Sequence, residues 1–208
     1  MINALLLLFS PAETWERIGR AQRSVSYIVV TYLLPVMIVT SFVEGWGLHV
    51  WGKWEGEISH VRQWPVGEAF VFEAGQLVVM LAIILFNSIL VKSVSETFHA
   101  RHTLQQGFTV IAYGLFPFFL ARMLNAFSDI TPWVSWIVGI LLAIAVMYHG
   151  VPRVMLPDPA HAFGLYMSTS LMLLLSTGLL ELVVASLMGG KFAKLERLIS
   201  SIAARLPS

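Results

Sequence analysis

Cysteine is absent from the 208 residues of this chain. Its absence excludes disulfides, thiol catalysis and metal sites built on cysteine ligands. Positive charge is missing where a secretory signal would need it, because no lysine or arginine precedes the apolar run LLLLF near the N-terminus. We therefore expect this first segment to belong to the mature protein.

Charge of either sign is scarce along the whole chain. Charged residues make up 12% of the sequence and hydrophobic residues 57%. In a soluble domain, about 25% of residues are charged and roughly 45–50% are apolar. The formal net charge is only +1, so no strong field would attract nucleic acid. These values predict an all-α polytopic membrane protein that has no nucleic-acid partner.

Five apolar windows are long enough to cross a bilayer, which takes about 20 residues. Four windows contain no Asp, Glu, Lys or Arg, and the fifth contains one acid, Glu181. The windows lie at about residues 24–43, 74–91, 103–121, 130–151 and 163–188. We therefore expect one membrane domain over residues 1–208 with five transmembrane helices. An odd number of spans places the two termini on opposite sides of the membrane.

Proline positions predict breaks in these helices. Pro35 and Pro117 lie within spans, where each removes a backbone donor and kinks its helix. After the fourth span, the stretch 148–166 reads YHGVPRVMLPDPAHAFGLY. We expect the fourth helix to end at His149 and Gly150, because Pro152 should not continue it. The residues that follow would form a turn before the fifth span.

Amphipathic segments flank the five spans. Residues 1–23 are predicted to form an interfacial helix, with a helix start at Ser10 and Pro11. Residues 191–206 have apolar side chains three or four positions apart, and basic side chains opposite them, which is typical of a helix on anionic lipid. The apolar positions are Phe192, Leu195, Ile199, Ile202 and Leu206, and the opposite side holds Lys194, Arg197, Ser201 and Arg205. The alternative is a helix packed on the protein's own bundle.

The few polar residues at or inside the spans are candidate functional residues. Glu181 lies within the fifth window, and a buried charge in a membrane usually faces a partner or water. We expect it to pair with Arg122, which ends the third span at the same side; an ion or substrate site is the alternative. Asn87 in the second span is expected to form a hydrogen bond to another helix.

Histidines gather near the other side of the predicted bundle. They are His99, His102, His149 and His161. Histidine is a common zinc or nickel ligand, so these four are weak candidates for a metal site. Their spacing does not match the His-Glu-x-x-His pattern of zinc hydrolases. We expect neither a metal nor any other cofactor.

Three segments together resemble the Yip-domain family (Ypt/Rab-interacting-protein type), and in particular its short bacterial members. The first segment is LFSPAETWERI at residues 8–18. The second, VIAYGLFPFFLARML at 110–124, has Tyr113 followed by Pro117. The third is a Tyr-x-Gly-x-Pro element formed by Tyr148, Gly150 and Pro152.

The resemblance implies a five-span bundle in the bacterial inner membrane, with the N-terminus in the cytoplasm and the C-terminus on the opposite side. Arg17, Arg20 and Arg23 at the entrance to the first span favour the same orientation. Eukaryotic relatives are linked to membrane traffic and organelle shape. We expect a non-enzymatic protein that organises membrane or binds lipid or protein partners, which could include a second copy of itself. The alternative is a transporter or scramblase for small molecules, ions or lipids.

Overall fold

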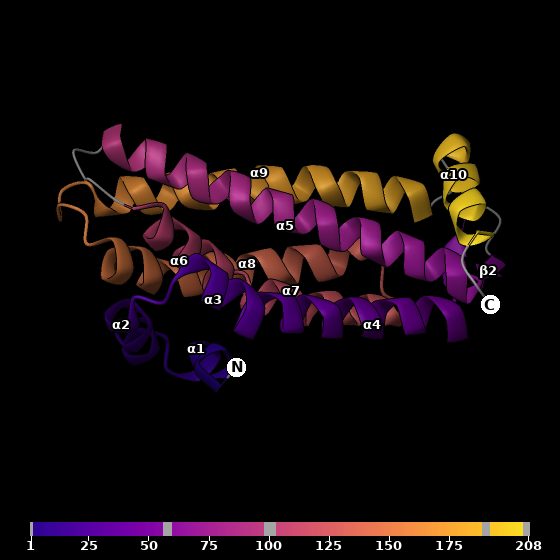
Figure 1. Ribbon diagram of the computed structural model, residues 1–208, viewed down its shortest axis with the longest axis horizontal. Helices are drawn as coiled ribbons and strands as arrows, with labels where there is room; N and C mark the ends of the chain where they lie inside the picture. The colour runs from indigo at the N-terminus through magenta and orange to yellow at the C-terminus, as the bar shows by residue number, and fades with distance from the viewer. Residues whose placement is uncertain (1, 56–59, 98–102, 189–191, 206–208) are drawn as a thin grey trace.

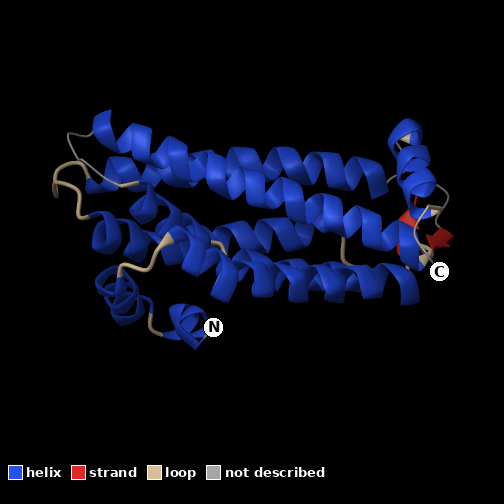
Figure 2. Ribbon diagram, viewed as in Figure 1, coloured by secondary structure: helices blue, strands red, loops and turns tan. Residues whose placement is uncertain are grey.

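The computed structural model describes residues 2–55, 60–97, 103–188 and 192–205. Nearly all of these residues are helical, and the strands described form one short hairpin (Figure 2). Before the hairpin come α1 (Ile2–Phe9), α2 (Pro11–Ala21), α3 (Val25–Ile28), the π-helical turn η1 (Val29–Leu33) and α4 (Leu34–Val50). The hairpin consists of β1 (Lys53–Glu55) and β2 (His60–Arg62). After it come α5 (Val66–Thr97), α6 (Leu104–Gly114), α7 (Phe116–Arg122), the 3₁₀ turn η2 (Met123–Ala126), α8 (Pro132–Met155), α9 (Ala162–Met188) and α10 (Ala193–Ala203).

Five helical segments are long and apolar enough to cross a membrane, which confirms the predicted all-α polytopic class. They are Val25–Val50, Val66–Thr97, Leu104–Ala126, Pro132–Met155 and Ala162–Met188. Several extend past the predicted windows because Glu44, Glu73 and Arg122, which had served as boundaries, lie inside or at the end of helices. Gly45, Trp46 and Gly47 lie beyond the predicted window 24–43 and are part of α4.

The five long segments lie side by side, and shorter helices lie at the two ends of the bundle (Figure 1). Helix α2 packs against α8 at one end, which we call the α2 end. Helix α10 lies across the opposite end, the α10 end, and packs against α5. The segment Leu104–Ala126 is the central one, because 78% of its most apolar stretch is buried, against 28–44% for the other four.

Proline breaks two of the long segments as predicted. The turn η1 precedes Pro35, and α6 and α7 are separated at Leu115, two residues before Pro117. Pro117 has no backbone N–H to donate to the Tyr113 carbonyl one turn earlier, so the helical hydrogen bonds stop there. The third span is therefore two short helices rather than one.

The predicted end of the fourth helix is wrong. Helix α8 continues through His149, Gly150 and Pro152 to Met155, and ends with Leu156 in the left-handed conformation at φ 46°. Pro152 removes only the hydrogen bond that its N–H would give to the Tyr148 carbonyl. Val151, Val154 and Met155 are buried around it, and this packing offsets the single lost bond.

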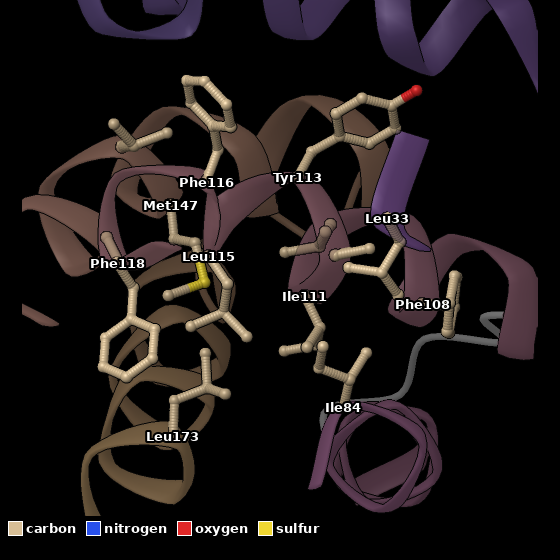
Figure 3. Close-up of a cluster of buried hydrophobic side chains, with 14 of the residues drawn as sticks. Leu33, Ile84, Phe108, Ile111, Tyr113, Leu115, Phe116, Phe118, Met147 and Leu173 are labelled. Carbon is tan, nitrogen blue, oxygen red and sulfur yellow. The ribbon is translucent and has the colours of Figure 1, made fainter. Parts of the chain in front are cut away.

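The core between the two ends is apolar. Ile84, Ile111, Leu115, Met147 and Leu173 are fully buried where α5, α6, α8 and α9 meet. Figure 3 shows Tyr113 and Phe116 on one side of the central segment, and Ile84 and Leu173 on the opposite side. Side chains therefore surround the central segment from opposite directions.

Candidate functional site

Segments far apart in the sequence meet at the α2 end around Trp15. Its ring is fully buried between α2 and α8, and its Nε1 donates a hydrogen bond of 2.9 Å to the Val146 carbonyl. A Cβ atom at Gly150 would lie 2.5 Å from a ring carbon of Trp15. Only a glycine therefore leaves room for the tryptophan, and this contact fixes α2 on α8.

Two tyrosines complete this group. Tyr113 stacks on Tyr32 with ring centroids 4.3 Å apart and planes at 9°, and it meets the Trp15 ring edge-on at 6.5 Å. The Tyr32 hydroxyl donates to the Ala112 carbonyl at 3.4 Å. We call Trp15, Tyr32, Tyr113 and Gly150 the aromatic junction. It joins the first, second and third segments of the family resemblance in one place.

Two residues of the Tyr-x-Gly-x-Pro element lie outside the aromatic junction. Tyr148 is 54% exposed, and its ring meets that of Tyr166 on α9 at 5.3 Å. Pro152 lines a cleft of about 810 Å³ between α2, α6 and α8, together with Gly19 and Gln106. The three residues of this element therefore lie in different surroundings, and of the three Gly150 is the one that contacts Trp15.

A second buried polar group lies toward the α10 end. Its centre is Arg122, which is 5% exposed. Its Nη2 atom donates to Glu44 Oε2 at 2.5 Å and to Gln76 Oε1 at 2.9 Å, and lies 3.5 Å from Glu73 Oε2. Asn125 Nδ2 donates to the other oxygen of Glu44 at 3.1 Å. We call Glu44, Glu73, Gln76, Arg122 and Asn125 the charge cluster.

The predicted pair between Arg122 and Glu181 is replaced by other partners. The ion pairs of Arg122 among the described residues are with Glu44 on α4 and Glu73 on α5. Glu181 is 6% exposed, and its Oε1 atom has no hydrogen-bond partner within the described part of the chain. The prediction missed Glu44 and Glu73 because both had been assigned to the membrane boundary. The available signal was that both acids border spans on the same side as Arg122.

Lys53 ties the hairpin to the turn that follows the charge cluster. This residue on β1 is 4% exposed, and its Nζ donates to the carbonyls of Asn125, Phe127 and Ile130 at 2.8, 2.6 and 2.7 Å. Burial lowers the pKa of the Lys53 ammonium to about 8, although the carboxylates of Glu44, Asp129 and Glu181 act in the opposite direction. All three of its donors are in use.

Asn87 links two long helices in the middle of the bundle, where the sequence suggested such a bond. It is fully buried, and its Nδ2 donates to Ser176 Oγ on α9 at 2.9 Å and to the Ile83 carbonyl at 2.8 Å. An interhelical bond of this kind holds α5 against α9.

The two candidate histidines in the described part of the chain, His149 and His161, are not part of a metal-ligand set. His149 lies 3.4 Å from Arg153 on the same helix, and His161 lies 3.9 Å from Asp158. His99 and His102 lie outside the described residues. Among the residues that are described, no group of three His, Asp or Glu side chains is placed to hold a metal ion.

Comparison with known protein families shows that the model of the Yip1 domain matches residues 5–199. This range contains the aromatic junction, the charge cluster and all five long helical segments. No curated protein and no solved structure matches the chain.

Proposed function

Because the chain belongs to the Yip1 domain family and has five helices able to cross a membrane, we propose that it is a non-enzymatic protein that organises the bilayer. The observation that carries this proposal is the placement of α10. This helix lies across the end of the bundle rather than along it (Figure 1). A helix across the end of a membrane bundle lies along the bilayer surface.

Helix α10 is attached to the bundle along one flank, by polar contacts and by the burial of Ile199 in an apolar cluster. Ser200 Oγ donates to Glu68 Oε1 at 2.7 Å, and Arg62 on β2 lies 3.5 Å from Glu196. Ala203 packs on Gly67, where a Cβ would lie 3.3 Å from the alanine Cβ. These contacts hold the helix in place without using most of its apolar side chains.

The apolar face of α10 is largely uncovered. Leu195, Leu198 and Ile202 are 39%, 54% and 42% exposed, and Ile199 alone is buried. At about 100° per residue, all four fall on one side of the helix. Such a face, with Lys194 on its exposed flank, is suited to insertion between lipid headgroups. Both predicted locations for this segment thus have support, since it packs on the bundle and also offers an apolar face to lipid.

At the N-terminus, we assign the interfacial position to α1 (Ile2–Phe9) rather than to the whole of residues 1–23. Helix α2 uses Trp15 and Ile18 to pack on α8 and has no free apolar face of that kind. Helix α1 exposes Leu5, Leu8 and Phe9 by 51%, 36% and 82%. Among the short helices at the two ends of the bundle, α1 and α10 are therefore the ones that expose several large apolar side chains.

The proposal includes a location and partners. We place the chain in the bacterial inner membrane with the N-terminus in the cytoplasm, because Arg17, Arg20 and Arg23 all lie at the α2 end. Lipid is the principal partner, bound by α1 and α10. A protein partner or a second copy of the chain would bind at the exposed apolar surface of these helices.

The transport alternative has less support from the packing. The charge cluster occupies only the part of the bundle near the α10 end, and the core next to it consists of apolar side chains such as Met80, Ile84 and Leu115. A polar route across the membrane would have to replace this packing.

Purified protein in liposomes tests the proposed function. We expect the wild type to change vesicle shape in electron micrographs, and the triple variant L195S/L198S/I202S to lose this effect while keeping its fold. The triple variant with Met at the same positions keeps apolar side chains and should retain the effect. Unchanged vesicles with the wild type would contradict the proposal, and flux or lipid scrambling above that of empty liposomes would favour transport.

A further inference from the structure

A groove runs between α4 and α5 on the outer surface of the bundle, toward the α10 end. Its volume is about 480 Å³. Phe42 and Trp46 of α4 and Phe70 and Val78 of α5 form its walls, and each is more than half exposed. Because both helices can cross the membrane, this groove opens to lipid rather than to water.

Glu73 is the one acid that lines this apolar groove. The residue is 5% exposed, and its Oε1 atom has no hydrogen-bond partner among the described residues. Its Oε2 atom accepts a long hydrogen bond of 3.5 Å from Arg122, and Ser41 also forms a side-chain hydrogen bond with the carboxyl group. A buried carboxylate with one oxygen left unpaired is unfavourable unless another group provides a donor or a positive charge.

The neighbouring cations compensate the charge of Glu73 only in part. Arg122 makes its shorter hydrogen bonds to Glu44 and Gln76. The three donors of Lys53 all bind backbone carbonyls. Three carboxylates, those of Glu44, Glu73 and Glu181, are therefore near two cations whose hydrogen bonds are mostly used, and Glu73 is the one that lines the groove.

Gly45 keeps the groove open above this carboxylate. A Cβ atom at Gly45 would lie 3.1 Å from Glu73 Cγ. A larger residue at this position would therefore press on the Glu73 side chain. Rotation about the last torsion of a glutamate is soft, so the buried Oε1 atom can turn toward a donor that enters the groove.

We propose that this groove binds a membrane phospholipid with a primary-ammonium headgroup, such as phosphatidylethanolamine. The ammonium donates a hydrogen bond to Glu73, and an acyl chain lies against Phe42, Phe70 and Val78. Trp46 belongs to a group of tryptophans at the α10 end that includes Trp51, Trp54 and Trp64, and tryptophan favours the membrane interface where headgroups lie. This lipid would be a partner in the organising function proposed above. The biological meaning of the site rests on that function, but the binding itself does not.

The chemistry of the groove distinguishes this ligand from other cations and lipids. A choline headgroup has a positive charge but no N–H to donate. An anionic headgroup that has no ammonium, such as that of phosphatidylglycerol, would bring a second negative charge to Glu73 and no N–H cation to offset it. A metal ion would need several further oxygen ligands, whereas the described lining is mainly apolar and adds only Ser41 and His49 as other polar side chains.

Native mass spectrometry of the purified full chain tests the proposal, with phosphatidylethanolamine, its mono-, di- and trimethylated forms, and phosphatidylglycerol as probes. The wild type should retain the unmethylated lipid about tenfold better than the trimethylated one, as expected for one hydrogen bond to a charged group. Glu73→Gln should abolish this preference, and Gly45→Ala should weaken binding of every lipid at the site. Glu181→Gln removes a nearby buried acid that does not line the groove, so it is the matched control and should keep the preference.

Equal retention of the methylated and unmethylated lipids by the wild type would overturn the proposal, as would an intact preference in Glu73→Gln. A second measurement needs no variant, since a photoactivatable phosphatidylethanolamine should label peptides containing residues 38–49 and 66–78. Labelling confined to other peptides would also overturn it. Both measurements are independent of the vesicle-shape assay. The lipid site can therefore be disproved while the organising function stands, and the organising function can be disproved while the lipid site stands.

Discussion

At the scale of single residues, the contact between Gly150 and Trp15 has a direct consequence for stability. Gly150→Ala places a methyl group 2.5 Å from the tryptophan ring, so the ring must leave its site or the helices must move apart. We expect a loss of about 1–3 kcal/mol in the free energy of unfolding, as is typical of overpacking. Thermal unfolding in detergent and the emission of Trp15 measure this change.

The control for this substitution is Gly75→Ala in α5, because a Cβ there meets nothing within 4 Å. Alanine also favours a helix over glycine by about 0.8–1.0 kcal/mol. Gly75→Ala should therefore be neutral or stabilising. If Gly150→Ala behaved in the same way, the tight contact with Trp15 would be disproved.

Arg122 gives a second prediction at this scale. Arg122→Met leaves the Glu44 carboxylate, which is fully buried, without its cation. We expect a loss of about 3–5 kcal/mol in the free energy of unfolding, the usual cost of breaking a buried ion pair. Adding Glu44→Gln should recover part of the loss, whereas adding Glu181→Gln should recover less. Equal recovery by both substitutions would indicate that Glu181 is also a partner of Arg122, as the sequence suggested.

The sequence identified several of these residues but not all of their partners. Arg122, Asn87 and Gly150 stand out because a charge, an amide and a glycine are unusual in or beside apolar helices. The partner of Arg122 was wrong because proximity in a bundle depends on helix rotation, and spacing along one helix does not give it. Lys53 was missed because a lysine in a loop is normally exposed, and only the folded turn places three carbonyls around it.

At the scale of elements, the bond between Asn87 and Ser176 joins α5 to α9. A double-mutant cycle with Asn87→Ala and Ser176→Ala should give a coupling of about 0.6 kcal/mol and no more than about 1.7, the range measured between membrane helices. Thermal unfolding of the four proteins supplies the values. Thr31→Ala is the control, because its hydroxyl bonds to the Tyr27 carbonyl of its own helical segment. Its coupling to Asn87→Ala should be zero, and equal couplings would contradict a specific link.

The existence of the helices was predictable, and their ends were less so. Apolar windows of about 20 residues fix the number of spans. The charged residues led us to predict helix ends that were too early, because Arg122 forms ion pairs with Glu44 and Glu73 inside the bundle. The end of α8 was also predicted too early, just before Pro152, because the packing of α8 against α2 continues beyond this proline. Residues 1–23 also form two helices rather than one, with a break at Ser10.

At the scale of the whole molecule, helices α2 and α10 lie at opposite ends of the bundle (Figure 1). The absence of cysteine makes the natural chain a ready background for labelling. We expect Glu13→Cys and Ser201→Cys, both at exposed positions, to react with a membrane-impermeant maleimide from opposite sides of sealed vesicles. Leu171→Cys, in the apolar part of α9, should not react. Reaction of both terminal cysteines from one side would rule out five spans.

The central position of Leu104–Ala126 has a consequence for biosynthesis. This segment is the third of five to leave the ribosome, yet it is the most buried. Helix α7 packs chiefly against α8, which begins at Pro132 and is made later. A nascent chain that has reached residue 126 therefore contains its future centre with one face still uncovered. The order of synthesis is thus not the order of assembly, and the last two spans must close around a segment that the membrane has already received.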